Sequence, residues 1–100
     1  MLEDVWKKLI KRTVYKYLPA DLYQIFLFGS RAEGTNRKWS DADIGLLGQQ
    51  KVPAEKLVEI ESDLSESDIP YLVEVVDFKF VTPEFAKIAL KTKIDLWPKS

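Results

Sequence analysis

The strongest constraint on the fold is a pair of acidic residues inside an apolar, strand-like run. Asp41 and Asp43 stand one residue apart at the start of the run 41–47, which otherwise holds apolar residues and a glycine. Side chains of a strand alternate between its two faces, so both carboxylates point to one face with Cα atoms roughly 6.6 Å apart. Two like charges on one face repel unless a cation or solvent compensates them. The pair therefore predicts a divalent-cation site on a β-sheet.

A glycine–serine turn precedes the acid pair. The run 22–28 is rich in β-forming residues and ends at Gly29, and Ser30 is placed to cap a short helix that starts near Arg31. Free backbone N–H groups and a hydroxyl at such a turn suit phosphate. The basic loop 34–40 has two interpretations, a solvated loop or a further contact to phosphate. The turn and the acid pair together suggest nucleotide chemistry.

These residues carry a resemblance to a known superfamily. Gly29-Ser30, followed by Ser-Asp-Ala-Asp-Ile at 40–44, resembles the GS…(S)DxD signature of the DNA polymerase beta nucleotidyltransferases. At 100 residues the chain looks like a minimal nucleotidyltransferase, the MNT subunit that is paired with a HEPN-domain protein in prokaryotic toxin–antitoxin modules. The resemblance implies a palm-like sheet in which acids from adjacent strands meet at one end.

The resemblance also implies roles for single residues. Asp41 and Asp43 would bind one or two Mg²⁺ ions, together with a third carboxylate from a later strand. The residues expected to contact the nucleotide are Gly29, Ser30, Arg31 and Ser40.

The third carboxylate has two candidates in the predicted strand 71–78. Alternation allows only one of Glu74 and Asp77 to face the first two acids. Glu74 interrupts the apolar run and takes the place where the family has its third carboxylate, so Glu74 is favoured as a metal ligand or as the acceptor of a proton. Asp77 lies near the end of the strand and remains the alternative, as a turn acid or as the third carboxylate.

The remaining elements complete an α/β (α+β) domain. Three amphipathic helices are expected, over 2–18, over 53–64, and from Thr82-Pro83 with an apolar stripe that extends to Ile94. The order of helices and strands predicts a single domain over 1–100, with two layers and a small mixed sheet flanked by helices. The place of Trp97 in the tail is left open.

Composition excludes several classes of site. The chain has no cysteine and no histidine, which excludes disulfides, thiolate metal sites, His-based triads and most zinc sites. A formal net charge of -1 argues against a protein that coats nucleic acid, so no direct nucleic-acid binding is expected. No apolar run approaches the ~20 residues of a membrane-spanning helix, and the cytoplasm is the expected location.

The resemblance implies a Mg²⁺-dependent nucleotidyltransferase. It would move a nucleoside monophosphate, AMP from ATP, to a hydroxyl acceptor such as a tyrosine of a HEPN toxin partner, and so act as the antitoxin. The alternative is a non-catalytic nucleotide- or partner-binding subunit of a HEPN/MNT complex, in which exposed aromatic residues anchor the partner. Candidate anchors are Trp6, Tyr17, Trp39 and Trp97. The acceptor, the base preference and the oligomeric state, homo- or hetero-oligomer, stay open.

Overall fold

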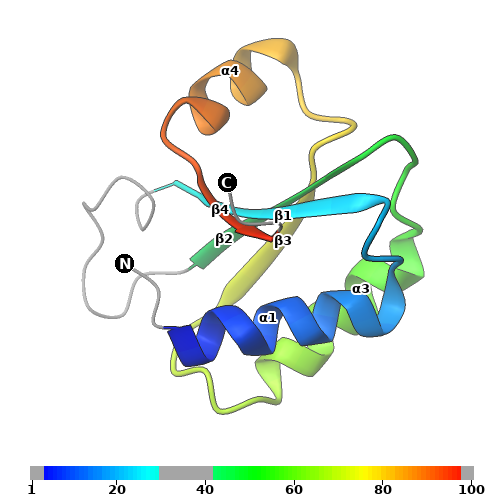
Figure 1. Ribbon diagram of the computed structural model, residues 1–100, viewed down its shortest axis with the longest axis vertical. Helices are drawn as coiled ribbons and strands as arrows, with labels where there is room; N and C mark the ends of the chain where they lie inside the picture. Colours follow the sequence, from blue (N-terminus) through cyan, green and yellow to red (C-terminus); the bar gives the residue numbers. More distant parts are fainter. Residues whose placement is uncertain (1–3, 30–41, 98–100) are drawn as a thin grey trace.

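The computed structural model describes residues 4–29 and 42–97, which form three helices and four strands (Figure 1). The expected short helix near Arg31 and the loop 34–40 lie outside the described residues. The elements in chain order are α1 Asp4–Tyr17, β1 Tyr23–Phe28, β2 Ala42–Gly48, α3 Ala54–Ser65, β3 Val73–Asp77, α4 Pro83–Lys91 and β4 Ile94–Trp97.

The strands form one mixed sheet in the order β3-β2-β1-β4. β1 is antiparallel to both of its neighbours, β2 and β4, whereas β2 and β3 are parallel. The parallel pair needs a crossover connection, and α3 supplies it. The predicted small mixed sheet is confirmed.

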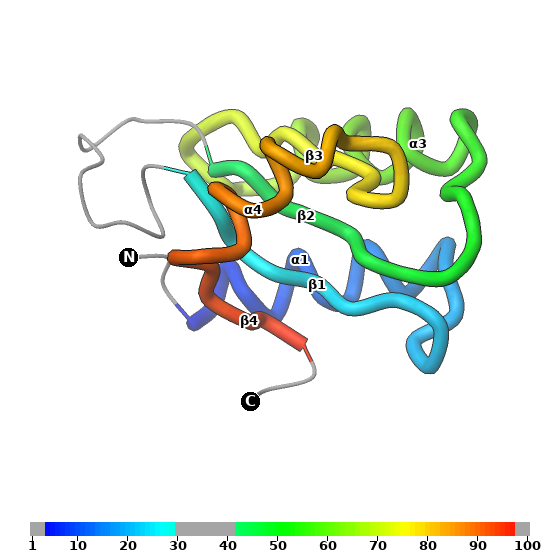
Figure 2. Tube along the Cα trace, turned by 90° about the horizontal axis from the view of Figure 1, so that it is seen from above, coloured from blue at the N-terminus to red at the C-terminus, as the bar shows by residue number. Residues whose placement is uncertain are grey.

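The two faces of the sheet are covered differently. Helices α1 and α3 lie side by side over one face and α4 lies over the other, as Figures 1 and 2 show. Alternate residues of β1 serve the two sides: Ile25 and Leu27 belong to the core under α1 and α3, whereas Phe26 and Phe28 belong to a smaller cluster beneath α4. The smaller cluster is completed by Phe78 and Ala89.

Local sequence explains where α4 begins. The hydroxyl of Thr82 accepts a hydrogen bond from the backbone N–H of Phe85 at 3.2 Å, and Pro83 takes the first helical position. None of the helices in the described part of the chain is long and apolar enough to cross a membrane.

The last strand corrects one expectation. Ile94 was predicted to extend the apolar stripe of the final helix, but the helix ends at Lys91 and Ile94 begins β4. Ile94 pairs with Leu27 of β1, so a contact between distant parts of the chain overrides the local helical spacing. Trp97 ends the same strand, and its ring lies 3.2 Å from Nζ of Lys11 on α1.

Candidate functional site

Strand pairing brings two of the predicted acids together. In the parallel register, Asp43 of β2 lies directly opposite Glu74 of β3, and in the antiparallel register Phe28 of β1 lies opposite Asp43. Residues that are opposite each other in a sheet point to the same face. Ala42 and Ile44 are buried under α1 and α3, so Asp43 and Glu74 point to the face that carries α4. Asp43 is partly buried and Glu74 is exposed.

Gly29 lies against the Asp43 carboxylate. Its φ of 75° is in the left-handed region, and a Cβ atom added there would stand 2.5 Å from Oδ2 of Asp43. Any side chain at this position would therefore displace the carboxylate and would strain the backbone. The glycine of the predicted phosphate turn and the acid of the predicted metal site are therefore neighbours in the fold.

Asp77 lies on the other face of β3 and has a different role. Its Oδ2 accepts a hydrogen bond from the backbone N–H of Val52 at 2.9 Å, and its Oδ1 accepts one from the N–H of Lys79 at 3.0 Å. Each carboxylate oxygen of Asp77 thus binds a backbone N–H group that follows the C-terminal end of β2 or of β3. Between the two candidates, the structure brings Glu74 to Asp43 and places Asp77 away from it.

The other predicted site residues, Ser30, Arg31, Ser40 and Asp41, lie outside the described residues. Within the ranges 4–29 and 42–97, no group of three acidic side chains is placed to hold a metal ion. Asp43 and Glu74 offer two adjacent carboxylates with oxygen donors, which fit a hard divalent cation such as Mg²⁺. Asp41 remains the predicted further ligand.

An aromatic cluster borders the site, and no role was predicted for it from the sequence. The ring of Phe28 is 5.0 Å from that of Phe78 and 5.9 Å from that of Phe85 on α4, and both pairs are edge-to-face. Because Phe28 is opposite Asp43, the cluster forms the apolar side of the site. The signal in the sequence was the alternation within β1, where Phe26 and Phe28 face away from Ile25 and Leu27.

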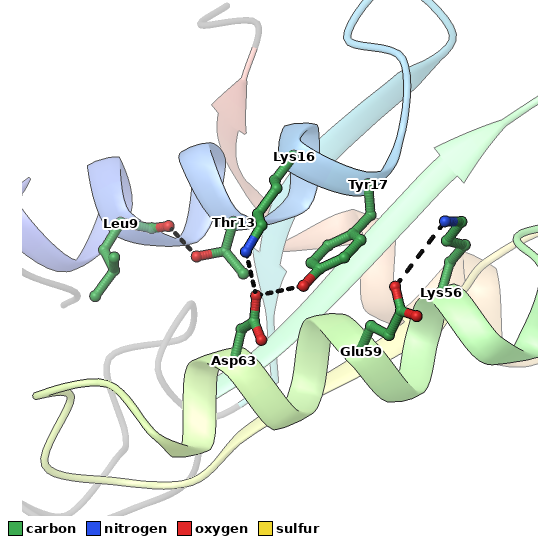
Figure 3. A network of polar contacts seen from close by, with 7 residues as sticks. All are labelled: Leu9, Thr13, Lys16, Tyr17, Lys56, Glu59 and Asp63. Atoms are coloured by element: carbon green, nitrogen blue, oxygen red, sulfur yellow. Dashed lines mark hydrogen bonds and ion pairs between the residues drawn. The ribbon is translucent and has the colours of Figure 1, made fainter.

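A polar network joins α1 to α3 on the opposite side of the sheet (Figure 3). Oδ2 of Asp63 accepts hydrogen bonds from the Tyr17 hydroxyl at 2.6 Å and from Nζ of Lys16 at 3.3 Å. The hydrogen bond from Tyr17, followed by that from Lys16, lowers the pKa of Asp63. A groove of about 860 Å³ beside the network is lined by residues of α1 and by Asp63. Both features are separated from Asp43 by the sheet.

Comparisons with known proteins identify the family and the fold. Residues 8–100 match the sequence profile of the family described as "Polymerase beta, Nucleotidyltransferase". A probable protein adenylyltransferase MntA of Haemophilus influenzae is 28% identical over 90 residues, which cover 90% of this chain and 78% of that protein.

Two solved structures show the same fold. A crystal structure of a toxin–antitoxin with AMP-PNP is similar with a TM-score of 0.76 and 25% identity, over 91% of this chain and 72% of that chain. A complex of tri-AMPylated Shewanella oneidensis HEPN toxin with MNT antitoxin is similar with a TM-score of 0.74 and 21% identity, over 96% of this chain and 72% of that chain.

These findings confirm three predictions from the sequence: the resemblance to MNT subunits, the mixed α/β fold and the assignment as a nucleotidyltransferase. The family match covers both strands that carry the predicted acids, as well as the glycine–serine turn. The chain belongs to the polymerase beta nucleotidyltransferase family.

Proposed function

We propose that the chain transfers AMP from ATP to a hydroxyl group of a HEPN-domain toxin, a tyrosine being the expected acceptor, and thereby acts as the antitoxin. The observation that carries this proposal is the meeting of Asp43 and Glu74 on adjacent strands, beside a glycine that leaves room for the Asp43 carboxylate. The similarity to a protein named a probable adenylyltransferase, and to a toxin–antitoxin structure with AMP-PNP, supports the choice of AMP and of a toxin as acceptor.

The carboxylates are proposed to bind Mg²⁺, in a site for two ions. Asp43 and Asp41 would hold the first ion, and Glu74 would complete the site for the second. Bound Mg²⁺ neutralises charge on the transferred phosphate and on the leaving pyrophosphate. Two adjacent carboxylates repel each other, and a bound cation would reduce that repulsion.

The remaining residues bind and orient the reactants. The backbone of Gly29, with Ser30, Arg31 and Ser40, is proposed to hold the phosphates of ATP. The acceptor oxygen forms a bond to the α-phosphorus, the bond to the β-phosphate oxygen breaks, and pyrophosphate leaves. Glu74 is exposed on the site face, and we propose that it either ligates the second ion or accepts the proton of the incoming hydroxyl.

The test compares Asp43→Asn with Asp77→Asn. Both substitutions remove one negative charge from neighbouring strands, but only Asp43 faces the proposed site. The wild-type chain and each variant are incubated with the proposed HEPN partner protein, ATP and Mg²⁺, and the added AMP is measured by mass spectrometry. We expect Asp43→Asn to lower the rate more than about 100-fold, since a metal site contributes several kcal/mol to such reactions. Asp77→Asn should keep most of the rate.

The alternative is a binding subunit that silences its partner without chemistry. It predicts that Asp43→Asn still binds and silences the HEPN protein as well as the wild-type chain does, with no AMP added in either case. That result would overturn the proposed transfer.

A further inference from the structure

Two large apolar side chains of α4 are unusually exposed to solvent. Phe85 is 43% exposed and Ile88 is 74% exposed, although they stand three residues apart on one side of the helix. In the whole of α4 only Ala89 is buried. An amphipathic helix of a globular protein ordinarily turns its apolar stripe toward the core. We call Phe85 and Ile88 the α4 face.

The α4 face is next to the proposed site. The Phe85 ring is 5.9 Å from that of Phe28, and Phe28 lies opposite Asp43 in the sheet. One aromatic ring therefore separates the α4 face from the site carboxylate. Figure 1 shows α4 on the side of the sheet away from α1 and α3, and in Figure 2, which looks onto that side, α4 lies near the end of β1 that leads to Gly29. A macromolecule bound to the α4 face would therefore lie beside the site.

Charges beside the α4 face favour one kind of occupant. Lys87 and Lys91 are exposed, lie one helical turn apart and flank Ile88. Helix α4 has only one acidic residue, Glu84. In the part of the chain that the structure describes, neither lysine is in an ion pair. Two copies of this chain that met through their α4 faces would bring like charges together, which disfavours self-association. A partner whose apolar patch is bordered by acidic residues fits better.

Other aromatic residues are less suited to this role. The anchors expected from the sequence, Trp6, Tyr17 and Trp97, are partly buried and pack against the main core. Trp39 lies outside the described residues. On α4, by contrast, the exposed Phe85 contacts Phe28, which lies opposite Asp43 in the sheet.

We propose that the α4 face docks the acceptor protein. The matching surface of the acceptor is an apolar patch with an acidic border, close to the hydroxyl that receives the nucleotide. The inference rests on the proposed function and adds the surface by which the protein substrate is held. Transfer to a protein hydroxyl requires the acceptor to be positioned against the site, and docking one aromatic ring away from Asp43 provides that position.

The experiment compares Ile88→Glu with Val58→Glu. Val58 is also a well-exposed apolar residue, at 65% against 74% for Ile88, and lies on α3 at the opposite side of the sheet. Ile88→Glu places a negative charge against an acidic partner, so we expect the KM for the HEPN protein to rise about 10- to 30-fold, with kcat unchanged. Val58→Glu should leave both constants unchanged. Thermal unfolding checks that each variant folds, and calorimetry checks that each binds ATP with Mg²⁺ as the wild-type chain does.

Three results would overturn the docking proposal. The first is that Ile88→Glu transfers AMP with the same KM as the wild-type chain. The second is that the chain alone forms a dimer that Ile88→Glu dissociates. The third is that the wild-type chain binds no HEPN protein. Failure of the proposed function has a different signature. In that case the HEPN protein binds and Ile88→Glu weakens the binding, but no AMP is added.

Discussion

Gly29 is the residue at which backbone conformation and site geometry depend most directly on each other. We predict that Gly29→Ala lowers the free energy of unfolding by about 1–3 kcal/mol, because a left-handed backbone costs an L-residue about 1–2 kcal/mol and the new methyl group meets the Asp43 carboxylate. Urea unfolding measures the loss, and the rate of AMP transfer should fall with it.

A second substitution separates the two causes. In an Asp43→Ala background the carboxylate is gone, so Gly29→Ala should cost only the backbone part, about 1–2 kcal/mol. An equal cost in both backgrounds would show that the contact between Gly29 and Asp43 has no energetic weight.

Glu74 and Asp77 should respond in opposite ways to loss of the carboxylate. Glu74 is exposed, so Glu74→Gln should change the free energy of unfolding by less than about 0.5 kcal/mol while it lowers the rate of AMP transfer. Asp77→Ala leaves the N–H groups of Val52 and Lys79 without their acceptor and should cost about 1–3 kcal/mol, with transfer retained. Denaturation and transfer measured on both variants decide the assignment, and the reverse pattern would make Asp77 the third carboxylate.

Part of this site was accessible from the sequence. The alternation of side chains along 71–78 was enough to show that Glu74 and Asp77 face opposite sides. It could not show which side faces Asp43, because the register of β2 against β3 is set by packing between strands that are far apart in the chain. The hydrogen bond from Val52 to Asp77 joins residues 25 positions apart and has no local signal.

At the scale of elements, Tyr15 attaches α1 to β1. Its hydroxyl donates a hydrogen bond to the backbone carbonyl of Tyr23 at 2.7 Å, and burial raises the pKa of Tyr15 to about 12. An unfolded tyrosine ionises near pH 10, so the stabilisation from the neutral hydroxyl is complete below about pH 10 and is lost between about pH 10 and 12. We predict that the free energy of unfolding falls across this interval.

Tyr15→Phe is the control for this pH dependence. It should lower stability at pH 8 by about 1 kcal/mol, through loss of the hydrogen bond. Above pH 10 its stability should fall less steeply than that of the wild-type chain. Some fall should remain, because the hydrogen bond to Asp63 raises the pKa of Tyr17 and desolvation raises that of Tyr23. Parallel curves for the two proteins would contradict the role given to Tyr15.

The elements themselves were predicted unevenly. The amphipathic helices and the apolar strands have strong local periodicity, so their positions were predicted to within a few residues. β4 was missed because its four residues follow α4 without a glycine or proline, and Ile94 continues the spacing of the helical stripe. Only its pairing with β1 makes this segment a strand, and that pairing is not visible in local sequence.

At the scale of the whole molecule, a ligand that binds only the folded chain must raise its stability. We predict that ATP with Mg²⁺, at about 100 times its Kd, stabilises the wild-type chain by about 2.7 kcal/mol, which corresponds to a Tm higher by about 10–20 °C for a protein of this size. A chelator should abolish the shift, and Asp43→Asn should show little of it. A shift of the same size in Asp43→Asn would place the nucleotide elsewhere.

The pairing of β4 with β1 has a consequence for how the molecule avoids aggregation. β1 has six residues that are all apolar or aromatic except Gln24, and β2 covers only one of its two edges. Short segments of this kind, with an open edge and no charge or proline, readily add strands from other molecules. β4 closes the second edge with a strand of the same chain, and it brings a charged residue, Asp95, opposite Phe26. The least predictable strand of the fold thus protects its most aggregation-prone one.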